Sequence, residues 1–463
     1  MTASTAAQPF RELFATSRSS EYFDPTTLQS MVGQPRHLFA DVILKELVDN
    51  ALDAAESAGS TPDIEITTTP VYHGKHDDDA EPHSYNLVVE DNGPGLPDSA
   101  VERVLDFDVL VSDKEKYRSP TRGQQGNALK TVLGIPYSLG VTEPVVITTP
   151  TGAHIITPRT DPAGEVVIGH ELRRHARRPA GTAVQVALVR PPDTGRWAAD
   201  FALVNPHAHI TAPAPAYRGN GDDEPGPVSY NPTVADHWSK PLPTDPTSPR
   251  WYDRDSFTKL VFAHIGKARN GGPDKPLGGF LREFAGLTGT AKAKTVAAQF
   301  PDIHYLSDFE PRPERVADLH AAMVAATREP KPTALGHVPE EHYRRCFADW
   351  YGIRRFWFRR VNTRDGSVPY LVEIAVAETQ RPGRLTFAVN YSPTFDDPTA
   401  RLPLSAGDSR ESLSATGVTE MLGQMDALPN GSNLRAAAVH LITPAAQFTD
   451  KGKTGLAVGH GTR

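Results

Sequence analysis

The chain has 463 residues, 38% of them hydrophobic, which allows roughly two or three folded cores. Its 42 prolines and 36 glycines predict a globular, loop-rich protein, and a net charge of −8 argues against a uniformly basic, nucleic-acid-binding surface. The single cysteine, Cys346, excludes an intrachain disulfide framework and a thiolate-built zinc site. No apolar run approaches the ~20 residues of a membrane helix and no secretory signal opens the chain, so we expect a cytoplasmic protein without a membrane partner.

The first half of the chain predicts one long helix beside a mixed sheet. Residues 36–58 carry apolar side chains at helical spacing, and Gly59 follows where such a helix would end. Runs rich in β-branched residues, separated by turn residues, predict the strands. These runs are 63–72, 86–90, 145–149, 154–157, 166–172 and 182–189.

The second half predicts a helical insert between two α/β units. Residues 212–250 are dense in Pro, Gly and Asp, which is typical of an exposed connector or an embellishing loop, and a boundary is expected near its end. The pattern is helical over 252–300, with a Gly-Gly turn inside it. Strand-like runs return after residue 353, at 356–361, 370–378, 385–390 and 436–443.

The first helix carries the acidic and amide side chains that indicate chemistry. Glu46, Asn50 and Asp53 are four and seven residues apart, so they project from one stripe of the helix. Taken alone, this stripe also fits an ordinary solvated helix face. Asp49 is expected only to cap or solvate the helix.

Two glycine-rich segments follow the helix. Asp91, Gly93 and Gly95 come directly after a strand, where glycines let the backbone approach a ligand, although an ordinary turn would look the same. Residues 122–130, RGQQGNALK, open an apolar helical run, and glycines before a helix expose N–H groups that bind phosphate oxygens. Gly181 and Thr182 then open a strand. The chain therefore carries, in this order, a polar helix motif, an Asp-Gly motif after a strand, a glycine-rich loop and a Gly-Thr pair.

This order resembles the GHKL ATPases, the superfamily with the Bergerat nucleotide-binding fold. Further motifs resemble the B subunit of topoisomerase VI in the same order along nearly the whole chain. They are RGQQG at 122–126, VNPHA at 204–208, LGGFL at 277–281 and FTDKGK at 448–453, with residues 10–23 similar to an N-terminal strap and 370–378 and 385–390 similar to transducer strands. The chain departs from the family where Ala128 replaces a third lid glycine.

The resemblance implies an α+β protein with three parts. Residues 1–247 would form the strap and the Bergerat-fold ATPase domain, with helices on one face of a mixed sheet. Residues 248–310 would form a helix-two-turn-helix-like domain that either contacts DNA or is structural. Residues 311–463 would form a transducer domain, and because ten residues follow Lys453, we expect it to lack the family's long terminal helix.

The resemblance also implies ATP and Mg²⁺ as cofactors and a role for each site residue. Glu46 would be the general base that polarises the attacking water, and Asn50 would be the protein ligand of Mg²⁺. Asp91 would accept the adenine amino proton, and Thr182 would support this pocket edge through its hydroxyl. The pocket wall and the lid over the phosphates would be formed by Gly93, Gly95, Gly123, Gln124, Gln125, Gly126 and Asn127.

The resemblance leaves two functions open. Lys453 would reach the γ-phosphate and so sense ATP, although by its position alone it is a solvated loop lysine. ATP would close a homodimeric clamp that gates double-stranded DNA, with cleavage by a separate A-type subunit. The alternative is a stand-alone, ATP-switched GHKL interaction protein without topoisomerase activity, which the short C-terminus favours. His337 and His342 miss the metalloprotease spacing, and His207 and His209 are expected to be structural or surface histidines.

Overall fold

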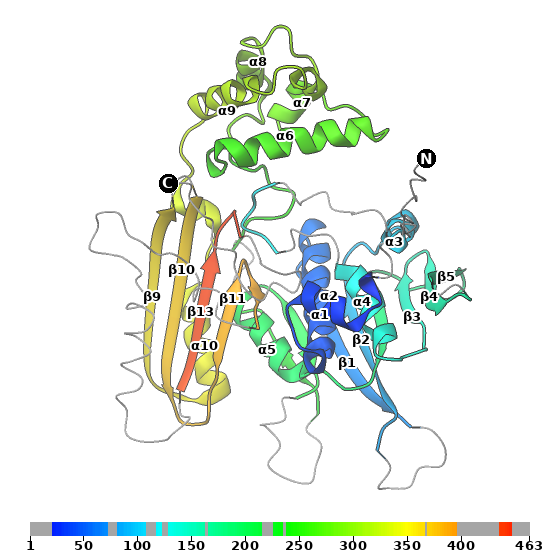
Figure 1. Ribbon diagram of the computed structural model, residues 1–463. Coiled ribbons are helices and arrows are strands. Elements are labelled where there is room, and N and C mark those ends of the chain that lie inside the picture. The colour runs from blue at the N-terminus through cyan, green and yellow to red at the C-terminus, as the bar shows by residue number, and fades with distance from the viewer. Residues whose placement is uncertain are drawn as a thin grey trace, which may run out of the picture.

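We analysed the protein as a computed structural model (Figure 1). The structure describes residues 21–72, 81–107, 117–122, 128–162, 165–214, 226–234, 238–365, 368–395 and 435–446. These residues form two sheets and a helical unit, and the helical unit lies above the sheets in the view of Figure 1.

The first sheet is mixed and buries one face. Eight of the described strands pair in the order β5-β4-β3-β6-β2-β1-β7-β8, all antiparallel except β1 with β7. In β1, Ile64 and Ile66 are buried while Glu65 and Thr67 are exposed, the alternation of a sheet with one solvated face. The strands are β1 Asp63–Val71, β2 Ser84–Asp91, β3 Val145–Thr149, β4 Gly152–Thr160, β5 Val166–Arg173, β6 Ala183–Leu188, β7 His209–Ala212 and β8 Val228–Tyr230.

Helices cover the buried face of this sheet. The long helix α2 packs against β2 and against both α4 and α5, and its residues Leu44, Val48 and Leu52 are fully buried. Helix α1 packs on α4, where a Cβ atom at Gly134 would lie 1.8 Å from the backbone oxygen of Tyr22, so only glycine allows this approach. The helices are α1 Pro25–Val32, α2 Phe39–Ser57, α3 Asp98–Leu105, α4 Ala128–Ser138 and α5 Thr194–Val204, with a 3₁₀ turn at Arg36–Leu38.

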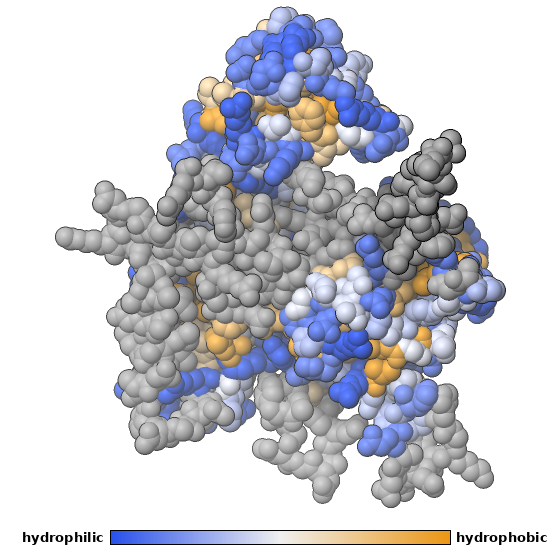
Figure 2. Space-filling view, viewed as in Figure 1, coloured by the Kyte–Doolittle hydropathy of each residue, from blue (hydrophilic) through white to orange (hydrophobic). Residues whose placement is uncertain are grey.

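A helical unit follows, built from α6 Arg254–Arg269, α7 Leu277–Leu281, α8 Thr290–Ala297 and α9 Arg315–Ala326. Phe257, Phe280 and Phe284 form its aromatic centre, and Leu319 and Met323 of α9 are buried in the same core. Figure 2 shows a largely hydrophilic outer surface on this unit, as expected if its apolar side chains face inward. Helix α9, which begins after residue 310, packs on α6 and α8.

The second sheet has the order β12-β11-β13-β10-β9 among the described strands and carries α10 on one face. Its pairs are antiparallel except β11 with β13. The elements are α10 Glu340–Tyr351, β9 Ile353–Asp365, β10 Val368–Thr379, β11 Leu385–Val389, β12 Ser392–Pro393 and β13 Arg435–Ile442. Short 3₁₀ turns lie at Pro249–Trp251, Leu306–Phe309 and Pro332–Leu335.

The α+β class and the helical insert between two sheet-containing units are confirmed, while the division into 1–247, 248–310 and 311–463 stays a prediction. One expectation is wrong in part: the segment 212–250 is not an exposed connector throughout. Lys240, Thr247 and Ser248 are buried because this segment packs between the units. No helix among the described residues is long and apolar enough to cross a membrane.

His342 joins the two sheet-containing units at the contact between α10 and α5. Its Nε2 lies 3.1 and 3.0 Å from the carbonyl oxygens of Ala202 and Leu203, two acceptors, so Nε2 carries a proton and donates. Its Nδ1 lies 2.5 Å from the Thr233 hydroxyl, which can donate to it. Burial lowers the pKa of His342 to about 4, so the imidazole is neutral in the folded protein at neutral pH.

This neutral histidine makes stability fall on acidification. In the unfolded chain His342 binds a proton below its ordinary pKa of 6.5, whereas in the folded chain it does so only near 4. We expect the free energy of unfolding to drop between pH 6.5 and 4 by about 3 kcal/mol more in the wild type than in His342→Gln, which cannot titrate. Denaturant unfolding at several pH values measures this, and parallel pH curves for the two proteins would contradict it.

Candidate functional site

Helix α2 directs its polar stripe at the loop that follows β2. Glu46 is buried at 5% exposure, whereas Asn50, one turn later, is exposed. Ala54 continues this stripe after another turn, and a Cβ atom at Gly93 would lie 3.0 Å from Ala54 Cβ. The loop of Asp91 and Gly93 therefore lies against the stripe that bears Glu46 and Asn50, which is more than a solvated helix face.

Asp91 is the last residue of β2, and its carboxylate is held from within the protein. Its Oδ1 accepts hydrogen bonds from the backbone N–H groups of Gly93 at 2.8 Å and Thr182 at 3.2 Å. Burial raises the pKa of Asp91, while these hydrogen bonds and the charge of Arg178 oppose the shift. The two bonds satisfy one carboxylate oxygen and so fix the orientation of the carboxylate.

Gly181 makes this arrangement sterically possible. Its φ is +71°, and a Cβ atom there would lie 1.7 Å from the backbone oxygen of Asp91. A Cβ atom at Gly93 would lie 2.9 Å from Asp91 Oδ1, and Gly95 lies beside Pro150 with φ +84°. Gly93 thus lies close to the Asp91 carboxylate and Gly181 close to the Asp91 backbone.

Part of the predicted site lies outside the described residues. These residues are the lid positions Gly123, Gln124, Gln125, Gly126 and Asn127, and the distant Lys453. The described chain resumes at Ala128, the first residue of α4, as the helical pattern predicted.

Asp49 is not a capping or solvated residue, and that expectation is wrong. Its side chain is 2% exposed, and Lys45 donates to its Oδ2 at 3.0 Å. The same oxygen accepts a hydrogen bond of 2.8 Å from Ser392 Oγ, at the edge of the second sheet. Lys45 Nζ also lies 3.6 Å from Glu46 Oε1, so a buried lysine links the two carboxylates. The expectation failed because α2 packs against other elements on several sides, and an amphipathic sequence pattern does not reveal such packing.

Arg122, the residue before the lid glycines, is the centre of a buried charge cluster. Its side chain is 1% exposed and lies 3.3 Å from Asp53 and 2.5 Å from Glu56, both on α2. Its Nη1 donates to Asn205 Oδ1 at 2.6 Å and to the carbonyl oxygen of Tyr391 at 3.4 Å. Burial alone would lower the pKa of Arg122, but the carboxylates around it raise the pKa instead.

Lys240 and His207 complete the cluster around Glu56. Lys240 Nζ lies 2.8 Å from Glu56 Oε1 and 4.7 Å from the centre of the Tyr391 ring, and His207 Nε2 lies 2.9 Å from the same oxygen. Burial and Arg122 lower the pKa of Lys240 to about 8, although Glu56 opposes the shift. Burial would raise the pKa of Glu56, but its cationic neighbours lower it strongly.

The sequence motifs contained Arg122, Asn205 and His207 but assigned the first two no role. Their partners lie tens to hundreds of residues away along the chain, so spacing could not have paired them. The position of Arg122 directly before the lid glycines was the one available signal. The His209 ring, in turn, bonds to Asp63 at 2.7 Å, a structural contact as expected.

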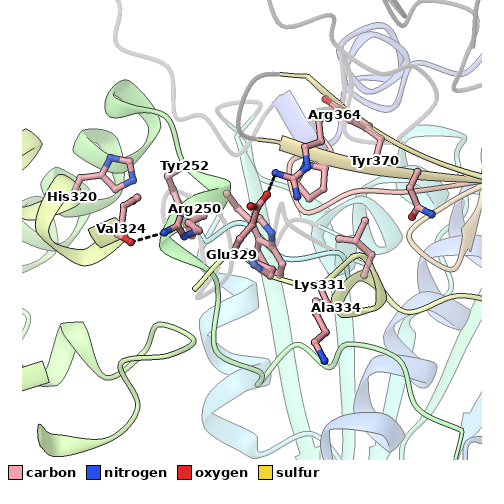
Figure 3. Close-up of a pocket in the computed structure, with 14 residues that line it drawn as sticks. Arg250, Tyr252, His320, Val324, Glu329, Lys331, Ala334, Arg364 and Tyr370 are labelled. Atoms are coloured by element: carbon pink, nitrogen blue, oxygen red, sulfur yellow. Dashed lines mark hydrogen bonds and ion pairs between the residues drawn. The ribbon is translucent and has the colours of Figure 1, made fainter. Parts of the chain in front are cut away.

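Neither of two cavities in the described part of the chain is lined by Glu46, Asn50 or Asp91. One, of about 390 Å³, lies between the helical unit and the second sheet (Figure 3). Its polar side chains bond to neighbours: Arg250 donates to the carbonyl oxygen of Val324, and Arg364 pairs with Glu329. Another, of about 300 Å³, is lined by Ser119, Pro120 and Lys240 beside the charge cluster. Both are voids where the units meet.

The donor set on α2 fits Mg²⁺. The described residues contain no group of three or more His, Cys, Asp or Glu side chains that could hold a metal ion by themselves. Asn50 offers an exposed amide oxygen on the same stripe as the carboxylate of Glu46. One or two oxygen ligands suit an ion that keeps several waters and binds substrate phosphates.

A comparison with protein families matches the part of the chain that contains α2 and the loop after β2. Residues 36–144 match the family described as "Histidine kinase-, DNA gyrase B-, and HSP90-like ATPase". The chain is 33% identical over 219 residues to the B subunit of type 2 DNA topoisomerase 6 from Natronomonas pharaonis, covering 44% of this chain and 25% of the relative. It is 28% identical over 299 residues to the Halobacterium salinarum protein of the same name, covering 61% of this chain and 33% of the relative.

The chain thus spans about a quarter to a third of the length of these relatives. Among solved structures, the gyrase B protein from Myxococcus xanthus covers 90% of this chain and 84% of its own, with 14% identity and a TM-score of 0.32. Over residues 36–144 the chain is thus similar to this ATPase family, and over part of its length it is similar to topoisomerase 6 B subunits.

Proposed function

We propose that this protein is a Mg²⁺-dependent ATPase of the topoisomerase VI B-subunit type. The observation that carries the proposal is Asp91: its Oδ1 accepts two backbone hydrogen bonds, and the loop that follows it approaches α2 at Ala54, one turn beyond Asn50. Such a group suits an acceptor for the adenine amino group because its second oxygen is already oriented. The family match over residues 36–144 includes Glu46, Asn50 and Asp91.

The mechanism assigns each side chain one task. Glu46, buried and near Lys45, would orient and deprotonate the water that attacks the γ-phosphate. Asn50 would hold Mg²⁺, which supplies charge neutralisation at the phosphates when bound. Gly93 and Gly95 would form the wall beside the base, and Thr182 would fix Asp91 through its backbone N–H.

The remaining assignments follow from the family resemblance. The lid residues 123–127 would cover the phosphates and Lys453 would contact the γ-phosphate, so that hydrolysis is sensed by the transducer. ATP would stabilise a homodimer that gates double-stranded DNA together with an A-type cleavage subunit. In the helical unit, Lys275 pairs with Glu283 and Arg269 with Glu310, so these acidic partners offset part of the positive charge that contact with DNA would use. The alternative remains an ATP-switched interaction protein without topoisomerase activity.

Glu46→Ala should separate binding from chemistry. Loss of the base should lower ATP hydrolysis by about 10²- to 10⁴-fold. ATP affinity should stay nearly unchanged because Glu46 contacts the water rather than the nucleotide. Steady-state hydrolysis and calorimetric titration measure the two effects, with Glu65→Ala on the exposed face of β1 as the control. Equal loss of binding and turnover would refute the assignment.

Asp91→Asn should weaken ATP binding by at least about 10- to 100-fold. The backbone donors of Gly93 and Thr182 would retain the amide oxygen, which turns the amide NH₂ group toward the adenine amino group, so two donors would face each other. Calorimetric titration with a non-hydrolysable ATP analogue measures the affinity, and circular dichroism checks the fold. An unchanged affinity would mean that the adenine pocket lies elsewhere.

The clamp and its partner need a separate experiment. Size-exclusion chromatography with a non-hydrolysable ATP analogue should show a dimer that the nucleotide-free protein does not form at the same concentration. A monomer with the analogue demonstrably bound would end the clamp proposal. Recovery of an A-type cleavage subunit in a pull-down favours the topoisomerase function over the alternative.

A further inference from the structure

The turn between β11 and β12 holds two adjacent residues at positive φ. Asn390 and Tyr391 have φ values of +50° and +67°, and neither is glycine. Two-residue hairpin turns favour positive φ and asparagine adopts it readily, whereas a residue such as tyrosine pays about 1–2 kcal/mol for it. Both residues are buried, so this turn lies in the interior of the protein and not on its surface.

Contacts from several elements hold this turn in place. The backbone N–H of Tyr391 donates to His440 Nε2 at 3.0 Å, and its carbonyl oxygen accepts from Asn205 at 2.9 Å and Arg122 at 3.4 Å. The Asn390 side chain bonds to both the N–H and the carbonyl oxygen of Thr443, at 2.8 and 2.9 Å. The next residue, Ser392, is therefore held at a defined position against α2.

Ser392 begins a chain of buried polar contacts that ends at Glu46. Its hydroxyl donates to Asp49 Oδ2 at 2.8 Å, Lys45 donates to the same oxygen at 3.0 Å, and Lys45 Nζ lies 3.6 Å from Glu46 Oε1. All four residues are buried, where a polar contact is stronger than in water. The second sheet thus contacts α2 at Asp49. The same carboxylate bonds to Lys45, the lysine that lies beside the proposed base Glu46.

We propose that Ser392 is a positioning residue for Glu46, acting through Asp49 and Lys45. The inference rests on the proposed function and adds a residue of the second sheet to it. Ser392 fixes the Asp49 carboxylate, which fixes the Lys45 ammonium, which in turn holds the Glu46 carboxylate in the orientation that hydrolysis needs. A displacement of the turn would then change the rate of the chemical step without any change at the nucleotide contacts.

A matched pair of substitutions tests this proposal. Ser392→Ala removes a hydroxyl–carboxylate bond between the second sheet and α2. Thr386→Val removes the same kind of bond between the second sheet and α5, where Thr386 Oγ1 donates to Asp200 at 2.6 Å. Both hydroxyls are buried, so both variants should lower Tm to a similar extent.

Only Ser392→Ala should affect catalysis. We expect its kcat for ATP to fall about 10-fold, with KM and the affinity for a non-hydrolysable analogue unchanged within about twofold. Thr386→Val should keep the kcat of the wild type. If Ser392→Ala does not fold, Ser392→Cys, similar in size but a weak donor, takes its place with the same expectation. Equal kcat values for Thr386→Val and the Ser392 variant would overturn the proposal.

A double-mutant cycle tests the path through Asp49. In an Asp49→Asn background, Ser392→Ala should lower kcat by less than about twofold, because the carboxylate through which it acts is gone. The same fold-loss in both backgrounds would overturn the path. If the wild type hydrolyses ATP and Glu46→Ala does not, the proposed function stands whatever Ser392→Ala shows. A wild-type protein without ATP hydrolysis would remove both.

Discussion

Arg122 is a full positive charge at 1% exposure, and it joins helix α2, the residue after α5 and the β11–β12 turn of the second sheet. A buried charge is tolerated only when opposite charges and hydrogen-bond acceptors replace the lost water. Glu56 and Asp53 of α2 supply the charges, and Asn205 and the carbonyl of Tyr391 supply the acceptors. Losing one partner of such a group typically costs about 3–5 kcal/mol, so these segments are held in one relative arrangement.

Helix α2 contacts both the loop after β2 and the second sheet, because it is packed on more than one side. Its stripe of Glu46, Asn50 and Ala54 runs toward the loop after β2, where Asp91 is fixed by backbone donors. Its other polar residues, among them Asp49 and Glu56, face the charge cluster and the second sheet. The helix that carries the candidate chemistry is therefore also the helix on which the two sheets meet, which is why a residue of the second sheet can influence the site.

Local patterns were sufficient for the elements and for part of the site. Helical spacing over 36–58 and β-branched runs led to α2 and the strands, because one-sided burial imposes a period that can be counted. Asp91 was singled out because a carboxylate at a strand end followed by glycines is a local signal, and its role in binding stays a prediction. The prediction for Asp49 was wrong because the sequence pattern of a helix is the same whether a polar residue faces water or a buried lysine. The burial of Lys240 was missed for a similar reason: Pro- and Gly-rich composition predicts irregular backbone, not exposure.

By itself, the amino-acid sequence determined most helices and strands and the order of the units, because these depend on neighbours along the chain; the α+β class and the nucleotide-binding roles were implied by the family resemblance, and the roles stay predictions. The tertiary structure alone decided which charges are buried together. Arg122 and Tyr391 are 269 positions apart, as the hydrogen bond between them records, and no periodicity links such positions. Burial removes water as the competing partner, so only the folded arrangement determines which carboxylate each cation must meet.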